Sequence, residues 1–148
     1  SDLELLFSAQ YIPNDSERIM LYRELDNMSN EEEIQSFTDR LRDRFGEIPE
    51  EGKELIRVVS LRTLAKQLGI EKVVLKKKKM NLHLINDTDS PYYQSKAFDK
   101  LLSFIQDNHR LCELREVNDK RSVSIKNIST VEQACEILKN ISLKEILN

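Results

Sequence analysis

The sequence predicts an α+β fold, in which a three-helix N-terminal part is followed by two β-β-α units forming a small, mainly antiparallel four-stranded sheet. Apolar residues recur at helical spacing up to Gly69. Beyond this glycine, short β-rich runs of alternating apolar residues appear in two pairs, and each pair is followed by a helical pattern. Helices on one face of the sheet would complete the fold.

A chain of 148 residues predicts one domain. Its 39% hydrophobic residues are enough for a core, and its 33% charged residues indicate a solvent-exposed polar surface. We expect three parts, namely an extended segment over residues 1–13, a helical part over 14–69, and a β-β-α-β-β-α part over 70–148. The formal net charge is −3, so no global positive field would recruit nucleic acid.

The first two helices have recognisable starts and apolar faces. Asn14 with Glu17, and Ser29 with Glu32, have the spacing of a capping box. We expect Gly46 to end the second helix in a left-handed conformation. The apolar positions are Leu21, Leu25 and Met28 in the first helix, and Ile34, Phe37, Leu41 and Phe45 in the second.

The third helix has a proline in its expected first turn, Pro49, and a glycine cap at its end, Gly69. Its apolar face is broad, which predicts burial against more than one neighbour. That face comprises Leu55, Val58, Val59, Leu61, Leu64, Ala65 and Leu68.

Two hairpins are predicted after Gly69. Residues 73–75 and 82–85 flank a turn that lacks glycine, whereas 111–117 and 122–128 flank Asn118-Asp119-Lys120, whose types suit tight turns. A helix opening at Ser90-Pro91 follows the first hairpin, with one of Tyr92 and Tyr93 packed and the other exposed. A helix capped by Ser129 and Glu132 follows the second.

The sequence contains no recognisable catalytic or nucleotide-binding motif. The chain has no phosphate loop, no G-x-G and no G-x-S-x-G, so we expect no catalytic residues, no cofactor and no enzyme activity. His83 and His109 are isolated, and His83 is expected to face solvent. Cys112 and Cys135 lack metal-ligand spacing and are expected to be reduced, mostly buried thiols, with no metal bound.

No apolar run approaches the roughly 20 residues that span a bilayer, and no signal peptide is evident, which predicts a cytoplasmic protein without a membrane partner. An unrecognised small enzyme stays a third hypothesis, because carboxylates are plentiful and a sequence cannot show a desolvated pocket.

The run Lys76-Lys77-Lys78-Lys79 is the strongest charge feature of the chain. Clustered ammonium groups displace condensed counterions, so one hypothesis is a nucleic-acid contact at the hairpin tip. The other is a solvated turn whose lysines prevent edge pairing, which the absence of interleaved aromatic residues favours.

A second charged feature is the end of the second helix, where Arg40, Asp43 and Arg44 must point outward because the apolar members form the core face. Arg40 and Arg44 share a face, and Asp43 can pair with either of them or with a partner molecule. Weak surface ion pairs are the structural interpretation of this segment, and a partner interface is the functional one.

Three motifs together decide between these interpretations: Tyr11-Ile12-Pro13, Asp43-Arg44-Phe45-Gly46-Glu47-Ile48-Pro49 and Leu68-Gly69-Ile70. In this order and spacing the chain resembles the C-terminal domain of the bacterial transcription-repair coupling factor (Mfd). The resemblance covers roughly residues 8 to 85, and beyond that only element order and length agree.

The resemblance implies a regulatory domain of a large ATP-driven DNA translocase that removes stalled RNA polymerase and recruits the excision-repair damage sensor. In that family the domain docks on the parent's own N-terminal module and masks the surface that binds the damage sensor. The resemblance carries this docking role onto Asp43 and Arg44. The family often has an acidic residue where Arg40 stands, and often a glycine turn where Lys77 and Lys78 stand.

Overall fold

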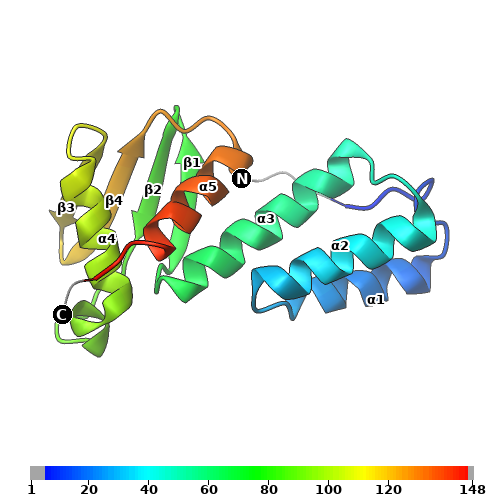
Figure 1. Cartoon of the computed structure of the whole chain (residues 1–148), viewed down its shortest axis with the longest axis horizontal. Coiled ribbons are helices and arrows are strands. Elements are labelled where there is room, and N and C mark those ends of the chain that lie inside the picture. Colours follow the sequence, from blue (N-terminus) through cyan, green and yellow to red (C-terminus); the bar gives the residue numbers. More distant parts are fainter. Residues whose placement is uncertain (1–5, 147–148) are drawn as a thin grey trace. The chain divides into compact units, whose positions relative to one another are not determined.

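The computed structural model describes residues 6–146 and divides into two units, residues 1–63 and 64–148 (Figure 1). Within the described residues, five α-helices, one short 3₁₀ helix and a four-stranded antiparallel sheet occur in the order α-α-α-β-β-α-β-β-α, with the 3₁₀ helix before α4. The α+β fold class predicted from the sequence is therefore confirmed. No helix in residues 6–146 is long and apolar enough to cross a membrane.

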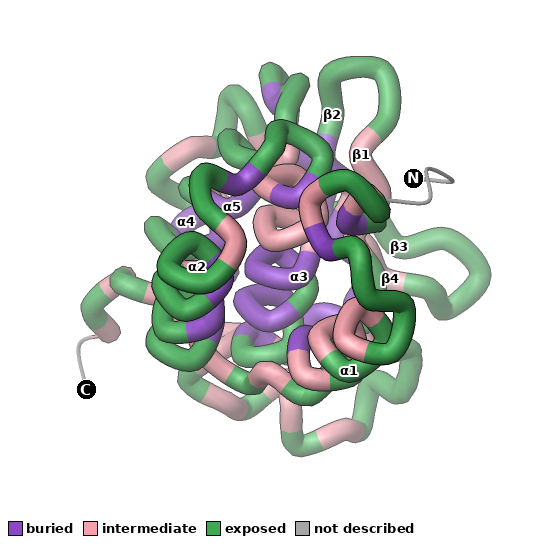
Figure 2. The backbone as a smooth tube through the Cα atoms, turned by 90° about the vertical axis from the view of Figure 1, so that its right-hand side faces the viewer, coloured by how far each residue is buried: buried purple, intermediate pink, exposed green. Residues whose placement is uncertain are grey.

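Unit 1 contains α1 (Asp15–Asp26), α2 (Glu31–Phe45) and most of α3 (Glu50–Gln67). The buried positions of α2, namely Ile34, Phe37 and Leu41, lie on one side of that helix, whereas in Figure 2 the buried part of α3 runs around the helix. Partly buried Tyr11, Tyr22 and Phe45 close the edges of this core. Its buried members are Phe7, Ile12, Leu25, Ile34, Phe37, Leu41, Ile48 and Val59.

The cap of α1 is confirmed, because the Asn14 side chain accepts a hydrogen bond from the Glu17 amide. The predicted cap of α2 is wrong by one residue: Asn30, not Ser29, accepts from the first turn, at the Glu33 amide 2.8 Å away. The Glu33 carboxylate in turn accepts from the Ser29 amide. With Asn30 as the cap, buried Ile34 lies at the fourth helical position. Ser29 and Asn30 are both suitable cap residues, so we infer that burial of Ile34 determines which of them caps the helix.

The cap of α5 (Val131–Ser142) shows the same one-residue shift. Thr130 and Gln133 form a complete capping box in place of the predicted Ser129 and Glu132. Here too the fourth helical position, Ala134, is buried.

Both predicted glycine helix ends are present. Gly69 has φ 70°, with Ile70 donating to Ala65 O at 2.9 Å and Gly69 donating to Lys66 O at 3.0 Å, which is a Schellman motif. Gly46 has φ 85° but ψ −166°, an extended region that essentially only glycine adopts rather than the left-handed helical region expected. Helix α3 begins at Glu50, so Pro49 precedes the helix instead of lying in its first turn.

The sheet of unit 2 contains β1 (Lys72–Lys76), β2 (Lys79–His83), β3 (Cys112–Val117) and β4 (Lys120–Lys126) in the order β1-β2-β4-β3. Helices α4 (Lys96–Asp107) and α5 cover one face of it, as expected (Figures 1 and 2). The register aligns Leu82 with Val123 and Met80 with Ile125 on the covered face, where all four are buried.

Both hairpins turn through two residues with positive φ. Lys77 and Lys78 have φ 53° and 61°, and Asn118 and Asp119 have φ 52° and 64°. Positive φ at both central residues is the signature of a type I′ turn, which matches the twist of the flanking strands. The first hairpin therefore forms without glycine, and its strands extend into both ends of the lysine run.

The helix expected to open at Ser90-Pro91 starts later. Residues Pro91–Gln94 form a 3₁₀ helix (η1), and Ser95 then caps α4 by accepting from the Phe98 amide. Both Tyr92 and Tyr93 are half-buried, so the expectation that one is exposed is wrong. The tight turn lets both rings pack edge-on against Phe98 while their hydroxyl groups donate to Leu68 O and Ile85 O.

Candidate partner interface

The exposed end of α2 is the candidate interface, and we name Asp43, Arg44 and Phe45 the α2 tip. Asp43 and Arg44 are exposed, whereas Phe45 is half-buried below them. The last turn of α2 follows the buried positions Phe37 and Leu41, so helical periodicity sets the outward direction of the two charged side chains. The surface that a partner would need is thus accessible within the described residues.

Arg44 is anchored to α1. Its Nε donates to Glu17 Oε1 at 2.6 Å, and its guanidinium carbon lies 5.1 Å from the centroid of the Phe45 ring. The hydrogen bond from Arg44 and the negative charge of Glu17 raise the pKa of the guanidinium further above its usual value. Two contacts therefore hold the Arg44 side chain in one orientation while 65% of it stays exposed.

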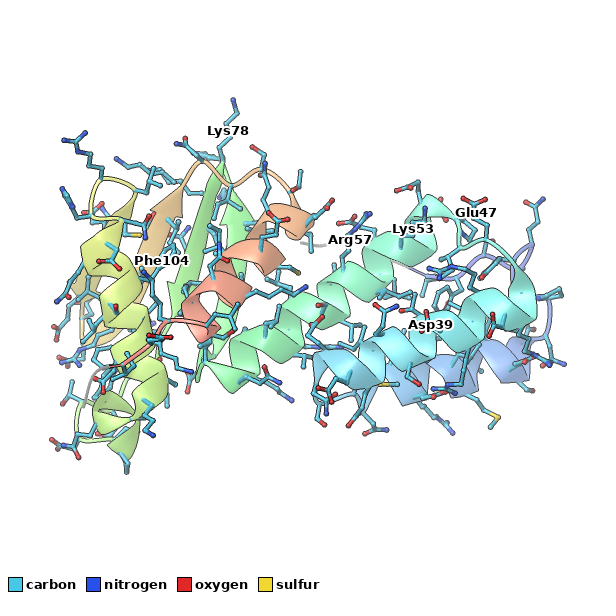
Figure 3. All side chains as sticks on the ribbon, viewed as in Figure 1. Asp39, Glu47, Lys53, Arg57, Lys78 and Phe104 are labelled. Carbon is cyan, nitrogen blue, oxygen red and sulfur yellow. The ribbon has the colours of Figure 1, made fainter. Side chains whose placement is uncertain are left out.

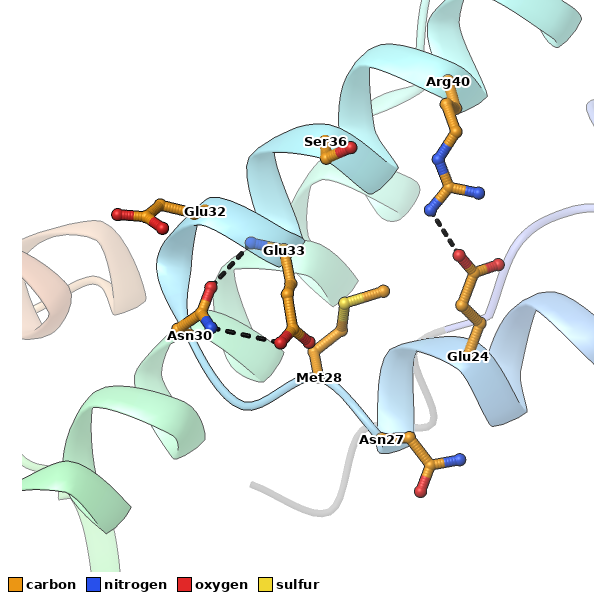
Figure 4. A pocket seen from close by; sticks show the side chains of 8 residues that line it. All are labelled: Glu24, Asn27, Met28, Asn30, Glu32, Glu33, Ser36 and Arg40. Atoms are coloured by element: carbon orange, nitrogen blue, oxygen red, sulfur yellow. Dashed lines mark hydrogen bonds and ion pairs between the residues drawn. The ribbon is translucent and has the colours of Figure 1, made fainter.

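Arg40 is anchored in the same way, one turn earlier. Its guanidinium donates to Glu24 of α1 (Figure 4). It also lies over the Phe37 ring, 5.8 Å from the centroid. The pair borders an open hollow of about 660 Å³. Asn30 and Glu33, which line this hollow, form the hydrogen bonds that cap α2.

The Asp43 side chain forms no ion pair or hydrogen bond with any other residue in the range 6–146. Of the pairings that the sequence left open, those of Asp43 with Arg40 or Arg44 are absent, because both arginines bind carboxylates of α1 instead. The α2 tip therefore presents one unpaired carboxylate beside one pre-oriented guanidinium. Sequence reasoning missed Glu17 and Glu24, which lie 27 and 16 residues from their partners.

The α2 tip is braced from below by the segment before α1. The Tyr11 ring lies 5.7 Å from the Phe45 ring, and its hydroxyl donates to Gly46 O at 2.7 Å. Burial raises the pKa of Tyr11, and the nearby charge of Arg42 partly opposes this rise. Two of the three motifs noted in the sequence are thus in direct contact.

The lysine run lies in unit 2, at the end of the β1–β2 hairpin. Lys76 and Lys79 pair across the hairpin as the last residues of β1 and the first of β2, and Lys77 and Lys78 form its turn. All four are exposed. Lys78 extends away from the end of the sheet in Figure 3.

The other histidines, cysteines and carboxylates of residues 6–146 form no metal-binding cluster. No group of three or more His, Cys, Asp or Glu residues in the range 6–146 could hold a metal ion. His83 is half-buried in β2, where it alternates with buried Leu82 and Leu84, and His109 is exposed. Cys112 is half-buried and Cys135 is buried, and burial raises the pKa of Cys112, which disfavours its reactive thiolate.

Comparison with known proteins places these features in a family. The TRCF domain model matches residues 1–95. The transcription-repair-coupling factor of Borreliella burgdorferi is 30% identical over 90% of this chain and 11% of its own length, and that of Rickettsia typhi is 29% identical over 84% and 11%. The chain thus spans about a tenth of the length of these relatives.

A solved structure agrees with the observed fold. The crystal structure of the C-terminal domain of a transcription-repair coupling factor superposes with a TM-score of 0.76 over 96% of this chain and 89% of that chain. Identity is 14%, so this match speaks for the fold alone. The family match over residues 1–95 agrees with the curated relatives, which are transcription-repair-coupling factors, and the chain belongs to the TRCF domain family.

Proposed function

We propose that this chain is a non-catalytic, autoinhibitory domain that docks through the α2 tip on the N-terminal module of its parent translocase. Docking would mask the surface of that module that binds the excision-repair damage sensor. Engagement of RNA polymerase and DNA by the parent would release it. Membership of the TRCF family supports the parent and its process.

The observation that carries the proposal is an unpaired carboxylate at a braced position. The Asp43 carboxylate has no partner in residues 6–146, whereas the Arg44 guanidinium beside it is held by Glu17 and Phe45. A pre-oriented charged group binds with less loss of side-chain entropy than a free one. We infer that Asp43 meets a basic group of the partner and that the remaining donors of Arg44 meet an acceptor.

Polar chemistry at the α2 tip suits a contact that must open again. The open state has to stay in water, and interfaces that separate are more polar than permanent ones. Unit 1 holds eight Lys or Arg and fifteen Asp or Glu, a formal charge of −7, so a basic patch on the partner would also be attracted at longer range. Arg40 is assigned a supporting role, because it fixes α2 against α1.

The test is charge reversal in the full-length parent. In Asp43→Arg we expect the damage sensor to bind at least about tenfold more tightly than in the unmodified protein, because the reversed charge weakens docking and exposes the sensor-binding surface. The fold should be unaffected, because the exposed Asp43 carboxylate forms no ion pair or hydrogen bond within residues 6–146. Sensor affinity would be measured by titration, and the midpoint of thermal unfolding would confirm an intact domain. Glu136→Arg, which reverses an exposed acid on α5, is the matched control.

An unchanged sensor affinity in Asp43→Arg, with the fold intact, would contradict docking at the α2 tip. An equal gain in Glu136→Arg would show that net charge, rather than the α2 tip, controls the closed state. The absence of catalysis belongs to the same proposal.

A further inference from the structure

The face of the sheet opposite α4 and α5 is covered by no described element of unit 2. Successive residues of a strand point to opposite faces, and Met80, Leu82, Val123 and Ile125 occupy the covered one. The alternate residues form what we call the open face. It comprises Lys72, Val74, Lys76, Lys79, Asn81, His83, Glu113, Arg115, Val117, Lys120, Ser122, Ser124 and Lys126.

The strand register arranges the charges of the open face in rows. Lys76 of β1 pairs with Lys79 of β2, which pairs with Lys126 of β4. Paired Cα atoms of neighbouring strands are about 4.5–5.5 Å apart, so three ammonium groups share one end of the sheet. None of the three forms an ion pair within residues 6–146.

A second row lies four residues further along the strands. It contains Lys72, His83, Ser122 and Arg115, at roughly 13 Å from the first row by the rise of about 3.3 Å per residue. Arg115 contacts Glu113, the one acidic residue of the open face, at 3.6 Å. Between the rows lie two short polar side chains, Asn81, which is half-buried, and Ser124, which is only 8% exposed.

Protection of sheet edges does not explain this pattern. The edge strands are β1 and β3, but Lys79 and Lys126 lie on the two central strands. Like charges placed directly opposite each other destabilise a sheet, and Lys79 has a lysine on each side. A ligand of opposite charge would offset that cost.

The positive charge of this surface is not apparent from the net charge of the chain, which is negative. Residues 64–148 hold fifteen Lys or Arg and eleven Asp or Glu, a formal charge of +4, within a chain of net charge −3. The positive charge is concentrated further on the open face, which carries six basic residues and one acidic residue.

The residue types of the open face indicate which class of ligand it could bind. A protein interface usually has aromatic or large apolar anchors, and single-stranded nucleic acid is usually held by base stacking on aromatic side chains. The open face has no aromatic residue other than His83, and its two large apolar side chains are valines. Lysine, serine and asparagine are side chains that contact phosphates, and the row spacing is close to the roughly 12 Å width of the major groove.

We propose that the open face binds the phosphate backbones of duplex DNA without reading sequence. The row Lys76-Lys79-Lys126 would lie along one backbone bordering a groove, and Lys72 and Arg115 of the second row would lie along the other. The site is centred on the face of the central strands rather than on the hairpin turn that the sequence singled out.

The test is titration of the 148-residue chain into a labelled 20-base-pair duplex over a salt series. We expect weak binding at low salt, with a slope of log K against log salt of about −3 to −4 for four phosphate contacts. In Lys79→Gln/Lys126→Gln the affinity should fall about tenfold and the slope should become shallower by about 2. Relief of lysine repulsion should leave the fold at least as stable, and Lys72→Gln/Lys76→Gln provides a second variant.

The matched control is Lys77→Asn/Lys78→Gly, which removes two charges from the turn and should change affinity by less than threefold. An equal loss in this variant would move the contact to the hairpin turn and overturn the proposal. So would undetectable binding at low salt, equal or tighter binding of the single strand, or tighter binding of polyglutamate, which would identify an acidic protein surface as the ligand.

Discussion

At the scale of single residues, Gly69 and Tyr92 show how one position couples helix geometry to packing. Gly69 adopts φ 70° to end α3, and a Cβ added there would lie 2.2 Å from Cε1 of Tyr92. The Tyr92 hydroxyl donates to Leu68 O at 2.8 Å, so the ring closes over the helix end. Glycine is required here both by the backbone conformation and by the space available.

Gly69→Ala should destabilise the domain by about 2–5 kcal/mol, because left-handed backbone strain and steric overlap add. The free energy of unfolding in urea measures the effect. In a Tyr92→Ala background the same substitution should cost about 1–3 kcal/mol less, since the overlap is gone. Equal costs in the two backgrounds would show that the ring does not contribute.

Tyr92 should also make stability depend on pH. Burial, followed by the nearby Tyr93, raises the pKa of Tyr92 to about 12 from 10.0. Because the folded state holds the proton more tightly, its stabilisation is fully present below pH 10 and is lost as pH rises toward 12. Between pH 9 and pH 11.5 the urea midpoint should therefore fall further in the unmodified chain than in Tyr92→Phe. Parallel pH profiles would contradict this assignment.

At the scale of elements, the β1–β2 hairpin folds with an unfavourable turn sequence. A non-glycine residue in the left-handed region costs roughly 1 kcal/mol or more, and Lys77 and Lys78 both adopt it. Asn118 and Asp119 occupy the equivalent turn between β3 and β4 with residue types that tolerate it. The pairing of β2 with β1 and β4 offsets this cost.

Lys77→Asn/Lys78→Gly should stabilise the domain by about 0.5–2 kcal/mol, because Asn-Gly is the preferred type I′ turn. Thermal and urea unfolding would measure the gain. The corresponding change in the second hairpin, Asp119→Gly, should stabilise less. A loss of stability in the lysine-turn variant would mean that these side chains make favourable contacts in the folded state.

At the scale of the whole molecule, two units with separate cores share α3. Val59 of α3 belongs to the core of unit 1, whereas Leu64 and Leu68 are buried in unit 2. The formal charges of the units are −7 and +4. The two proposed surfaces divide in the same way, with the docking tip in the acidic unit and the DNA-binding face in the basic one.

Phe37→Ala should test whether the two cores open independently. Phe37 is 1% exposed, and its truncation should cost about 3–5 kcal/mol. We expect amide hydrogen exchange to accelerate in α1 and α2 and to change little in β2 and β4, because partial opening follows separate cores. Uniform acceleration across the chain would instead show one cooperative unit.

Local sequence patterns predict the order of elements, the approximate starts of α1, α2, α3 and α5, and the turn of the second hairpin. Those features depend on neighbours within about four residues: apolar periodicity, caps, and positive-φ turn types. Where two equivalent caps were adjacent, as at Ser29 and Asn30, burial of Ile34 decided between them. Local chemistry alone could not.

The contacts that shape the candidate sites join residues far apart in the sequence. The sequence placed Asp43 and Arg44 on an exposed helix end, but the pairing of Arg44 with Glu17 and the support from Tyr11 join positions 27 and 35 residues apart. The open face likewise depends on strand order, which puts Lys126 beside Lys79. Such contacts are set by how the core packs, and the spacing of residues along a chain does not encode which distant side chains meet.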